Sequence, residues 1–167
     1  MYSILKARRY VITEGDHKSL DLIKPLWDKL NQYHYKLSDS FQSRFLNVDW
    51  DQCKKDLTDN SKDILIIYVR DKRRQMIIGF CISRVDKANE KEGEIDTLYI
   101  DPKYRNTGLG KKLIRKAIDW LSQKGVESTK LKVVTGNESL IKYYRKFGFY
   151  PIHMVLQKRH RDHPKPS

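Results

Sequence analysis

Residues 98–113 read LYIDPKYRNTGLGKKL, and this segment gives the clearest indication of the order of strands and helices. It opens with apolar residues typical of a buried strand, which Asp101 and Pro102 bring to an end. Gly108 and Gly110 follow, and apolar residues then recur at intervals of three and four, which predicts a helix. A strand that leads through a glycine-containing turn into a helix is typical of the α/β class.

This turn has the chemistry of an anion site. Glycines let the backbone approach a ligand closely, and the first N–H groups of a helix point outward at the positive end of its dipole. Arg105, Lys111 and Lys112 add positive charge, so the turn suits a phosphate or a pyrophosphate. The alternative is an ordinary turn in which glycine serves only the backbone geometry. Neither GxxxxGK[ST] nor a complete GxGxxG is present.

Upstream, hydrophobic spacing predicts an initial strand, two helices, a strand hairpin and the strand that the quoted stretch completes. The expected bounds are, in chain order, 8–12, 20–37, 40–55, 63–69, 76–82 and 94–100. Pro25 lies near the first turns of the helix expected over 20–37, where a missing N–H is tolerable, and a start near residue 24 is the alternative.

Downstream, the helix after Gly110 is expected to end near Lys124 and Gly125, because glycine suits a C-terminal cap. A strand, a short helix and a last strand complete the chain, with expected bounds 129–134, 137–146 and 154–157. Together these elements predict a mixed α/β layer sandwich.

The length and composition indicate one domain. The 167 residues are 39% hydrophobic, which is enough to fill a core and excludes a chain that is disordered over its whole length. We expect a single domain over residues 1–158 and a flexible basic tail over 159–167, which has no apolar anchor. No apolar run approaches a membrane span and the start lacks a secretory leader, so we expect a cytoplasmic protein without a membrane partner. Cys53 and Cys81 lack CxxC spacing and are expected to be reduced thiols.

The net charge of +13 indicates an anionic partner, either a nucleic acid or a small ligand. The 34 Lys and Arg residues are scattered along the chain instead of forming one basic arm. We therefore do not expect nucleic acid as the main partner, and most of the charge is expected on the solvated surface. The sequence does not decide the oligomeric state, and a homodimer is one of the alternatives.

Two motifs resemble the GNAT superfamily of N-acetyltransferases. The sequence RNTGLG at 105–110 matches the family's R/Q-x-x-G-x-G/A segment, and NESLIKYYRKFGF at 137–149 resembles its second signature. The resemblance covers nearly the whole chain. It implies a mixed, mostly antiparallel central sheet with a parallel splayed pair, flanked by helices.

The resemblance also implies acetyl-coenzyme A as co-substrate. No metal is expected, because His160 and His163 have no third ligand nearby in the sequence. The end of the strand at 98–100 would pair its backbone with the pantetheine arm, and the turn at 106–111 would hold the pyrophosphate. Asn137 would contact the coenzyme, although asparagine is also a good helix N-cap. The implied coenzyme-binding residues are Leu98, Tyr99, Ile100, Arg105, Asn106, Thr107, Gly108, Leu109, Gly110, Lys111, Asn137 and Tyr144.

Two side chains are candidates for the chemistry. An amine acceptor must lose a proton before it attacks a thioester, and Glu94 matches a glutamate that acts as base in some family members. Asp96 is the second choice, and a solvated strand start is the alternative for both. Tyr144 matches the family position that donates a proton to the departing thiolate. Its neighbour Tyr143 shares the same helix face, so either tyrosine could be core.

The acceptor site is expected to involve Trp27, His34 and Asp96, although Trp27 and His34 both lie on an apolar helix stripe and suit core packing. The resemblance implies direct transfer of acetyl to a primary amine in a ternary complex, since no activated cysteine is visible. The acceptor is expected to be a small-molecule amine or a protein N-terminus. The alternatives are a catalytically silent acyl-coenzyme A regulator of the same fold and a basic nucleic-acid-binding module.

Overall fold

The computed structural model of the protein describes residues 9–158. The expected tail at 159–167 and the first residue of the expected initial strand lie outside the described residues. The described residues form two compact units: 9–30 with Val48–Lys132, and Asn31–Asn47 with 133–158. A single domain over 1–158 stays a prediction.

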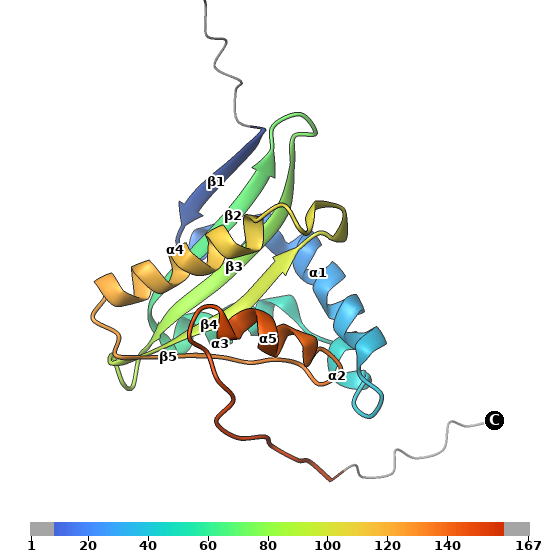
Figure 1. The fold of residues 1–167 in the computed structure, drawn as a ribbon, viewed down its shortest axis with the longest axis vertical. Helices are drawn as coiled ribbons and strands as arrows, with labels where there is room; N and C mark the ends of the chain where they lie inside the picture. The colour runs from blue at the N-terminus through green and yellow to red at the C-terminus, as the bar shows by residue number, and fades with distance from the viewer. Residues whose placement is uncertain (1–8, 159–167) are drawn as a thin grey trace, which may run out of the picture. The chain divides into compact units, whose positions relative to one another are not determined.

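The first unit is built on a five-stranded sheet in the order β1-β2-β3-β4-β5 (Figure 1). The strands are β1 (Tyr10–Gly15), β2 (Ser61–Asp71), β3 (Met76–Asp86), β4 (Glu92–Ile100) and β5 (Ser128–Leu131). The first three pairings are antiparallel, and β4 pairs with β5 in parallel. The expected mixed, mostly antiparallel sheet with one parallel pair is therefore confirmed.

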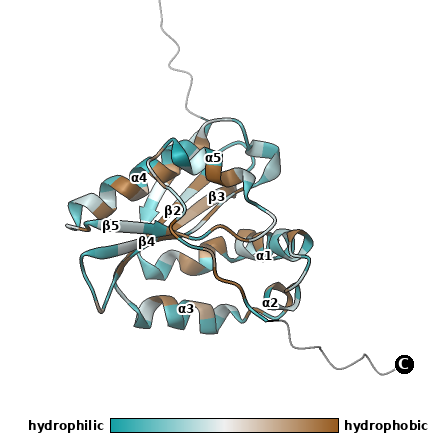
Figure 2. Cartoon of the chain, turned by 60° about the horizontal axis from the view of Figure 1, so that its bottom comes forward, coloured by the Kyte–Doolittle hydropathy of each residue, from teal (hydrophilic) through white to brown (hydrophobic). Residues whose placement is uncertain are grey.

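Helices cover both faces of this sheet (Figure 1). One face carries α4 (Leu109–Gln123), and the other carries α3 (Trp50–Asp59) and the start of α1 (Leu20–Leu37). Figure 2 shows hydrophobic and hydrophilic residues interspersed along each helix, as expected for helices with one buried face. The largest fully buried side chains lie between the sheet and its helices: Leu20, Ile23, Ile66, Ile67, Val69, Ile78, Phe80, Ile82, Val85, Leu113, Ile114 and Leu121.

The parallel pairing of β4 with β5 is short. It runs from Glu92, opposite Ser128, to Ile95, opposite Leu131, whereas β4 continues to Ile100. Within the described residues of the first unit, β5 therefore leaves the edge of β4 open from Asp96 onward. An edge of this kind can pair with an extended ligand.

A bulge interrupts β4 at the same point. Ile82 on β3 lies opposite Thr97 and Ser83 lies opposite Ile95, so Asp96 has no residue opposite it on β3. A bulge of this kind bends the strand and changes the direction of the extra side chain.

The second unit contains the end of α1, the short helix α2 (Ser43–Leu46) and α5 (Ser139–Arg145). Gly136 has a φ of 92°, and a Cβ atom there would lie 2.5 Å from the carbonyl oxygen of Leu37. Only glycine permits this backbone approach. On α5, the ring of Tyr144 lies 5.6 Å from that of Tyr143 and 6.3 Å from that of Phe149.

The first helix has the expected bounds, 20–37, with Pro25 inside it, so the alternative start near residue 24 is not adopted. Two element predictions were wrong. The helix expected over 40–55 is divided into α2 and α3, because the Asp49 side chain accepts hydrogen bonds from the N–H groups of Asp51 and Gln52 and starts a new helix at Trp50. The strand expected over 154–157 is absent from the described residues, where Ile152, Met154 and Leu156 are exposed.

Candidate functional site

The start of α4 is an open helix N-terminus. Gly108 is its N-cap residue, with a φ of 79°, and no side chain caps the first turn. Asn106 also has a positive φ, of 61°. A Cβ atom on Gly108 would meet nothing within 4 Å, so glycine is needed here for its backbone conformation and not for space. The first N–H groups of α4 are therefore available to an anion at the positive end of a 15-residue helix.

Hydrogen bonds hold the loop before α4 in place. The Asp101 carboxylate accepts from the N–H of Lys103 at 3.1 Å and forms an ion pair with Lys29 at 3.1 Å. Arg105 donates from Nε to the carbonyl oxygen of Ile100 at 3.0 Å. Thr107 donates from Oγ1 to the carbonyl of the preceding turn at 2.7 Å. These contacts tie the loop to the end of β4.

The first unit fits the diphosphate and the amide arm of coenzyme A. The diphosphate requires N–H donors and positive charge, which the uncapped start of α4 and the exposed side chains of Arg105, Lys111 and Lys112 provide. The arm requires an extended backbone partner, which the open edge of β4 provides at residues 98–100.

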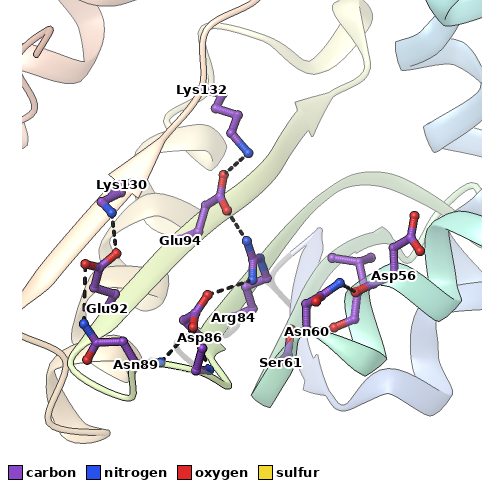
Figure 3. Close-up of polar contacts among 12 residues, drawn as sticks. Asp56, Asn60, Ser61, Arg84, Asp86, Asn89, Glu92, Glu94, Lys130 and Lys132 are labelled. Atoms are coloured by element: carbon purple, nitrogen blue, oxygen red, sulfur yellow. Dashed lines mark hydrogen bonds and ion pairs between the residues drawn. The ribbon is translucent and has the colours of Figure 1, made fainter. Parts of the chain in front are cut away.

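Glu94 lies at the centre of an ion-pair cluster on the sheet (Figure 3). It stands directly opposite Arg84, whose Nη2 donates to Oε2, while Lys132 Nζ lies 2.9 Å from Oε1. Burial raises the pKa of Glu94, but the hydrogen bonds and charges of Lys132 and Arg84 outweigh it, so the net pKa is lowered. Glu94 is therefore held as a carboxylate.

Asp96, two residues along β4, has a different environment. Its Oδ2 accepts a hydrogen bond from Thr97 Oγ1 at 2.7 Å. Burial raises the pKa of Asp96, and the nearby charge of Glu94 raises it further. The two carboxylates that the sequence singled out are thus close on one strand, with pKa values shifted in opposite directions.

The remaining predicted residues lie on separate parts of the chain. Trp27 is only 7% exposed and packs against Trp50 at a ring distance of 4.8 Å, as a core residue does. His34 belongs to the second unit, 5.3 Å from the Phe45 ring, and burial lowers its pKa. Tyr144 is buried in the second unit.

Asn137, also in the second unit, is not the N-cap of α5, because Glu138 holds that position. The other use that the sequence suggested for Asn137, contact with the coenzyme, stays a prediction.

Sequence reasoning did not find Arg84, Lys132 or Thr97. Their contacts with the two carboxylates depend on the register of β4 with its neighbours, and a bulge shifts that register in a way that hydrophobic spacing does not reveal. Among the described residues, no group of three or more His, Cys, Asp or Glu side chains is arranged to hold a metal ion. No helix in the described range is long and apolar enough to span a bilayer.

Residues 25–149 match the model of the acetyltransferase (GNAT) family, which is more than half of the chain. The chain belongs to this family. Among curated relatives, this GNAT chain is 34% identical over 68 residues to an uncharacterized N-acetyltransferase of Methanocaldococcus jannaschii, covering 41% of this chain and 29% of that protein. It is 32% identical over 83 residues to N-alpha-acetyltransferase RimI of Mycobacterium tuberculosis, covering 49% of this chain and 51% of RimI.

A solved GNAT-type structure has a similar fold. An aminoglycoside acetyltransferase from an uncultured soil metagenomic sample matches with a TM-score of 0.59 and 18% identity, covering 91% of this chain and 95% of that one. This likeness extends to the fold alone. The comparisons do not support a silent regulator or a nucleic-acid-binding module.

Proposed function

We propose that the protein is an N-acetyltransferase that transfers the acetyl group of acetyl-coenzyme A directly to a primary amine while both substrates are bound. One observation carries the proposal: a short loop after Ile100 connects the uncapped start of α4 to the strand whose edge β5 leaves open beyond Ile95. Membership of the acetyltransferase (GNAT) family supports the donor.

The donor is bound mainly by backbone. N–H groups from Asn106 to Lys111 hold the pyrophosphate, and the side chain of Arg105 adds charge. The backbone of residues 98–100 pairs with the pantetheine arm, so the side chains there remain available for packing. Bound acetyl-coenzyme A supplies a thioester, whose carbonyl carbon is the electrophile.

Two residues of the second unit, Tyr144 and Asn137, have the roles that the family resemblance implies. The Tyr144 hydroxyl donates a proton to the sulfur as the C–S bond breaks and negative charge develops there. Asn137 contacts the coenzyme. A carboxylate on β4, either Glu94 or Asp96, takes the proton that the acceptor amine must lose.

The cysteines support direct transfer without an acetyl-enzyme. Burial raises the pKa of Cys53 to about 11 and that of Cys81 to about 12, so both are thiols at neutral pH. A thiol is a poor nucleophile compared with a thiolate. The amine itself therefore attacks the thioester.

The acceptor class is a small-molecule amine or a protein N-terminus. The likeness to an N-alpha-acetyltransferase supports the second. Trp27 and His34 are proposed to contribute to the acceptor side, together with Asp96.

A thiol-release assay with acetyl-coenzyme A tests the function on three amines: a peptide with a free N-terminus followed by acidic residues, glycinamide and spermidine. We expect thiol release to require an amine, and mass spectrometry to find the acetyl group on that amine. If acetyl-coenzyme A does not bind at micromolar concentration in calorimetry, or if no amine is acetylated, the proposal is rejected.

A further inference from the structure

Two of the carboxylates on β4, Glu94 and Asp96, are candidates for the proposed base, and the structure distinguishes them. The distinction rests on the proposed function and deepens it, because it concerns which carboxylate receives the proton of the acceptor amine. Glu94 aligns with the family motif. Asp96 differs from Glu94 in its hydrogen bonds and in its place on the strand.

Both oxygens of Glu94 are already engaged. Oε2 accepts from Arg84 and Oε1 forms the ion pair with Lys132 (Figure 3). Arg84 Nη1 also lies 3.8 Å from Asp86 Oδ2. Cations and carboxylates therefore alternate along the cluster, in the order Lys132, Glu94, Arg84 and Asp86. A proton on Glu94 would have to displace two cations from a side chain that is only 11% exposed. This arrangement favours a permanent anion over a proton acceptor.

Asp96 has the properties that Glu94 lacks. It is the extra residue of the bulge and the first residue of β4 beyond the pairing with β5, so it lies where the open edge begins. Among the described residues, its carboxylate has one hydrogen-bond donor, Thr97 Oγ1. The cations nearest to it, Arg84 and Lys132, are already paired with Glu94.

Groups from three further segments face Asp96. Arg84 on β3 and Lys132 after β5 lower its pKa, and Glu94 on β4 raises it. From α3, Cys53 is close enough for the charge of Asp96 to raise its pKa, and it stays a neutral thiol. Burial is the largest influence on Asp96 and raises its pKa, which makes this carboxylate a stronger base than an exposed aspartate.

We infer that Asp96 is the catalytic base and that Glu94 is a positioning residue, which binds Arg84 and Lys132 and keeps both cations off Asp96. In the reaction, an N–H bond of the ammonium breaks and an O–H bond forms on Asp96. The freed lone pair forms the C–N bond, the C–S bond breaks, and its electron pair leaves on sulfur, which takes the proton of Tyr144. The second amine proton passes to solvent, the Tyr144 phenolate regains a proton from solvent, and Asp96 releases its proton to solvent, so that one proton is released per turnover.

The test compares three variants, Asp96→Asn, Glu94→Gln and Asp86→Asn, by thiol release with acetyl-coenzyme A and the peptide whose free N-terminus precedes acidic residues. We expect Asp96→Asn to lower kcat/KM at neutral pH by about 100-fold, the lower range for loss of a general base. The difference in kcat/KM between Asp96→Asn and the wild type decreases at high pH, because the free amine is abundant there. Asp86→Asn removes a carboxylate beside the same arginine and leaves the rate unchanged.

Glu94→Gln has a distinct pH profile. Its kcat/KM falls by less than about fivefold, because the base remains. Loss of the Glu94 charge and release of both cations lower the pKa of Asp96, so the decline of activity on acidification moves to lower pH than in wild type. A base at Glu94 would instead lose this decline altogether in Glu94→Gln and keep it in Asp96→Asn, and that result overturns the inference.

Calorimetry separates folding failure from chemical failure. Asp96→Asn is expected to bind acetyl-coenzyme A with wild-type affinity, which shows an intact donor site. Asp96→Glu, which restores the carboxylate, is expected to recover at least tenfold of the lost rate. Activity of the wild type together with full activity of Asp96→Asn rejects the base assignment and leaves the proposed function standing. An inactive wild type rejects both.

Discussion

Tyr143 and Tyr144 are adjacent on α5, yet their surroundings differ. Tyr144 is 8% exposed and its ring contacts Phe149, whereas Tyr143 is half-buried against Phe147 at 5.4 Å. Burial raises the pKa of Tyr143, so its hydroxyl stays protonated at neutral pH. Removal of this hydroxyl is expected to change the rate of acetyl transfer little. The pair therefore offers a test of the acid with its own control.

Tyr144→Phe is expected to lower kcat by about ten- to a thousandfold, because the hydroxyl acts on the sulfur as charge develops in the transition state. The affinity for acetyl-coenzyme A, measured by calorimetry, changes little. Tyr143→Phe, the matched control, keeps kcat within about twofold. Equal losses in the two variants would mean that neither hydroxyl is the proton donor.

The sequence predicted the candidate carboxylates but not their relation. Glu94 and Asp96 are visible as acidic residues on a predicted strand, and motif alignment ranks Glu94 first. Their different partners arise from cross-strand register and from a bulge, and both depend on how β3 meets β4. For this reason Arg84, 10 residues away in the chain, could not be assigned to Glu94 beforehand.

At the scale of elements, α4 has the same glycine geometry near both of its ends. Gly108 precedes the helix with a φ of 79°, and Gly125 follows it with a φ of 77°. A Cβ atom at either position would meet nothing within 4 Å. Only Gly108, however, lies where the proposed pyrophosphate binds.

Gly108→Ala is expected to weaken acetyl-coenzyme A binding about tenfold, because alanine disfavours the left-handed conformation by about 1–2 kcal/mol and moves the loop N–H groups out of line. Gly125→Ala carries the same backbone strain at the other end of the helix. It is expected to lower the melting temperature as much as Gly108→Ala and to leave the dissociation constant unchanged. A common loss of affinity would assign the effect to stability and not to the anion site.

Element predictions succeeded where hydrophobic spacing is strong and failed where local capping decides. The helix after Gly108 and the strands of the hairpin have clear periodicity, and all three are present. The helix expected over 40–55 is interrupted because Asp49 caps a new helix in its middle. The strand expected over 154–157 has suitable residues, but a strand also needs an edge to pair with, which a single segment does not reveal.

At the scale of the whole molecule, charge is the dominant property. The chain carries 34 Lys and Arg against 21 Asp and Glu, a net charge of +13. Such a field repels polycations and attracts anions, and salt screens it over about 10 Å at 0.1 M. The acceptor is therefore expected to be a neutral or acidic amine.

In the thiol-release assay, the peptide with acidic residues after its free N-terminus is expected to have a higher kcat/KM than spermidine by about tenfold or more at low salt. Raising the salt concentration narrows this ratio, while glycinamide responds little. If spermidine is the best of the three at both salt concentrations, the local carboxylates and not the net charge govern acceptor choice.

The bulge in β4 has a consequence for insertions and deletions. Most residues of a strand cannot be deleted, because every side chain beyond the deletion moves to the opposite face of the sheet. Asp96 is different, since Ser83 pairs with Ile95 and Ile82 with Thr97 on either side of it. A chain without this one residue keeps both pairings and an unbroken ladder.

The fold and the proposed chemistry are therefore separable by a single codon. Loss of Asp96 would remove a carboxylate from the point where the pairing of β4 with β5 ends, and would leave Arg84 opposite Glu94. In an alignment of related proteins, the length of this strand is therefore as informative as the residue at position 96. A relative that is one residue shorter here keeps the strand pairing and lacks the proposed base.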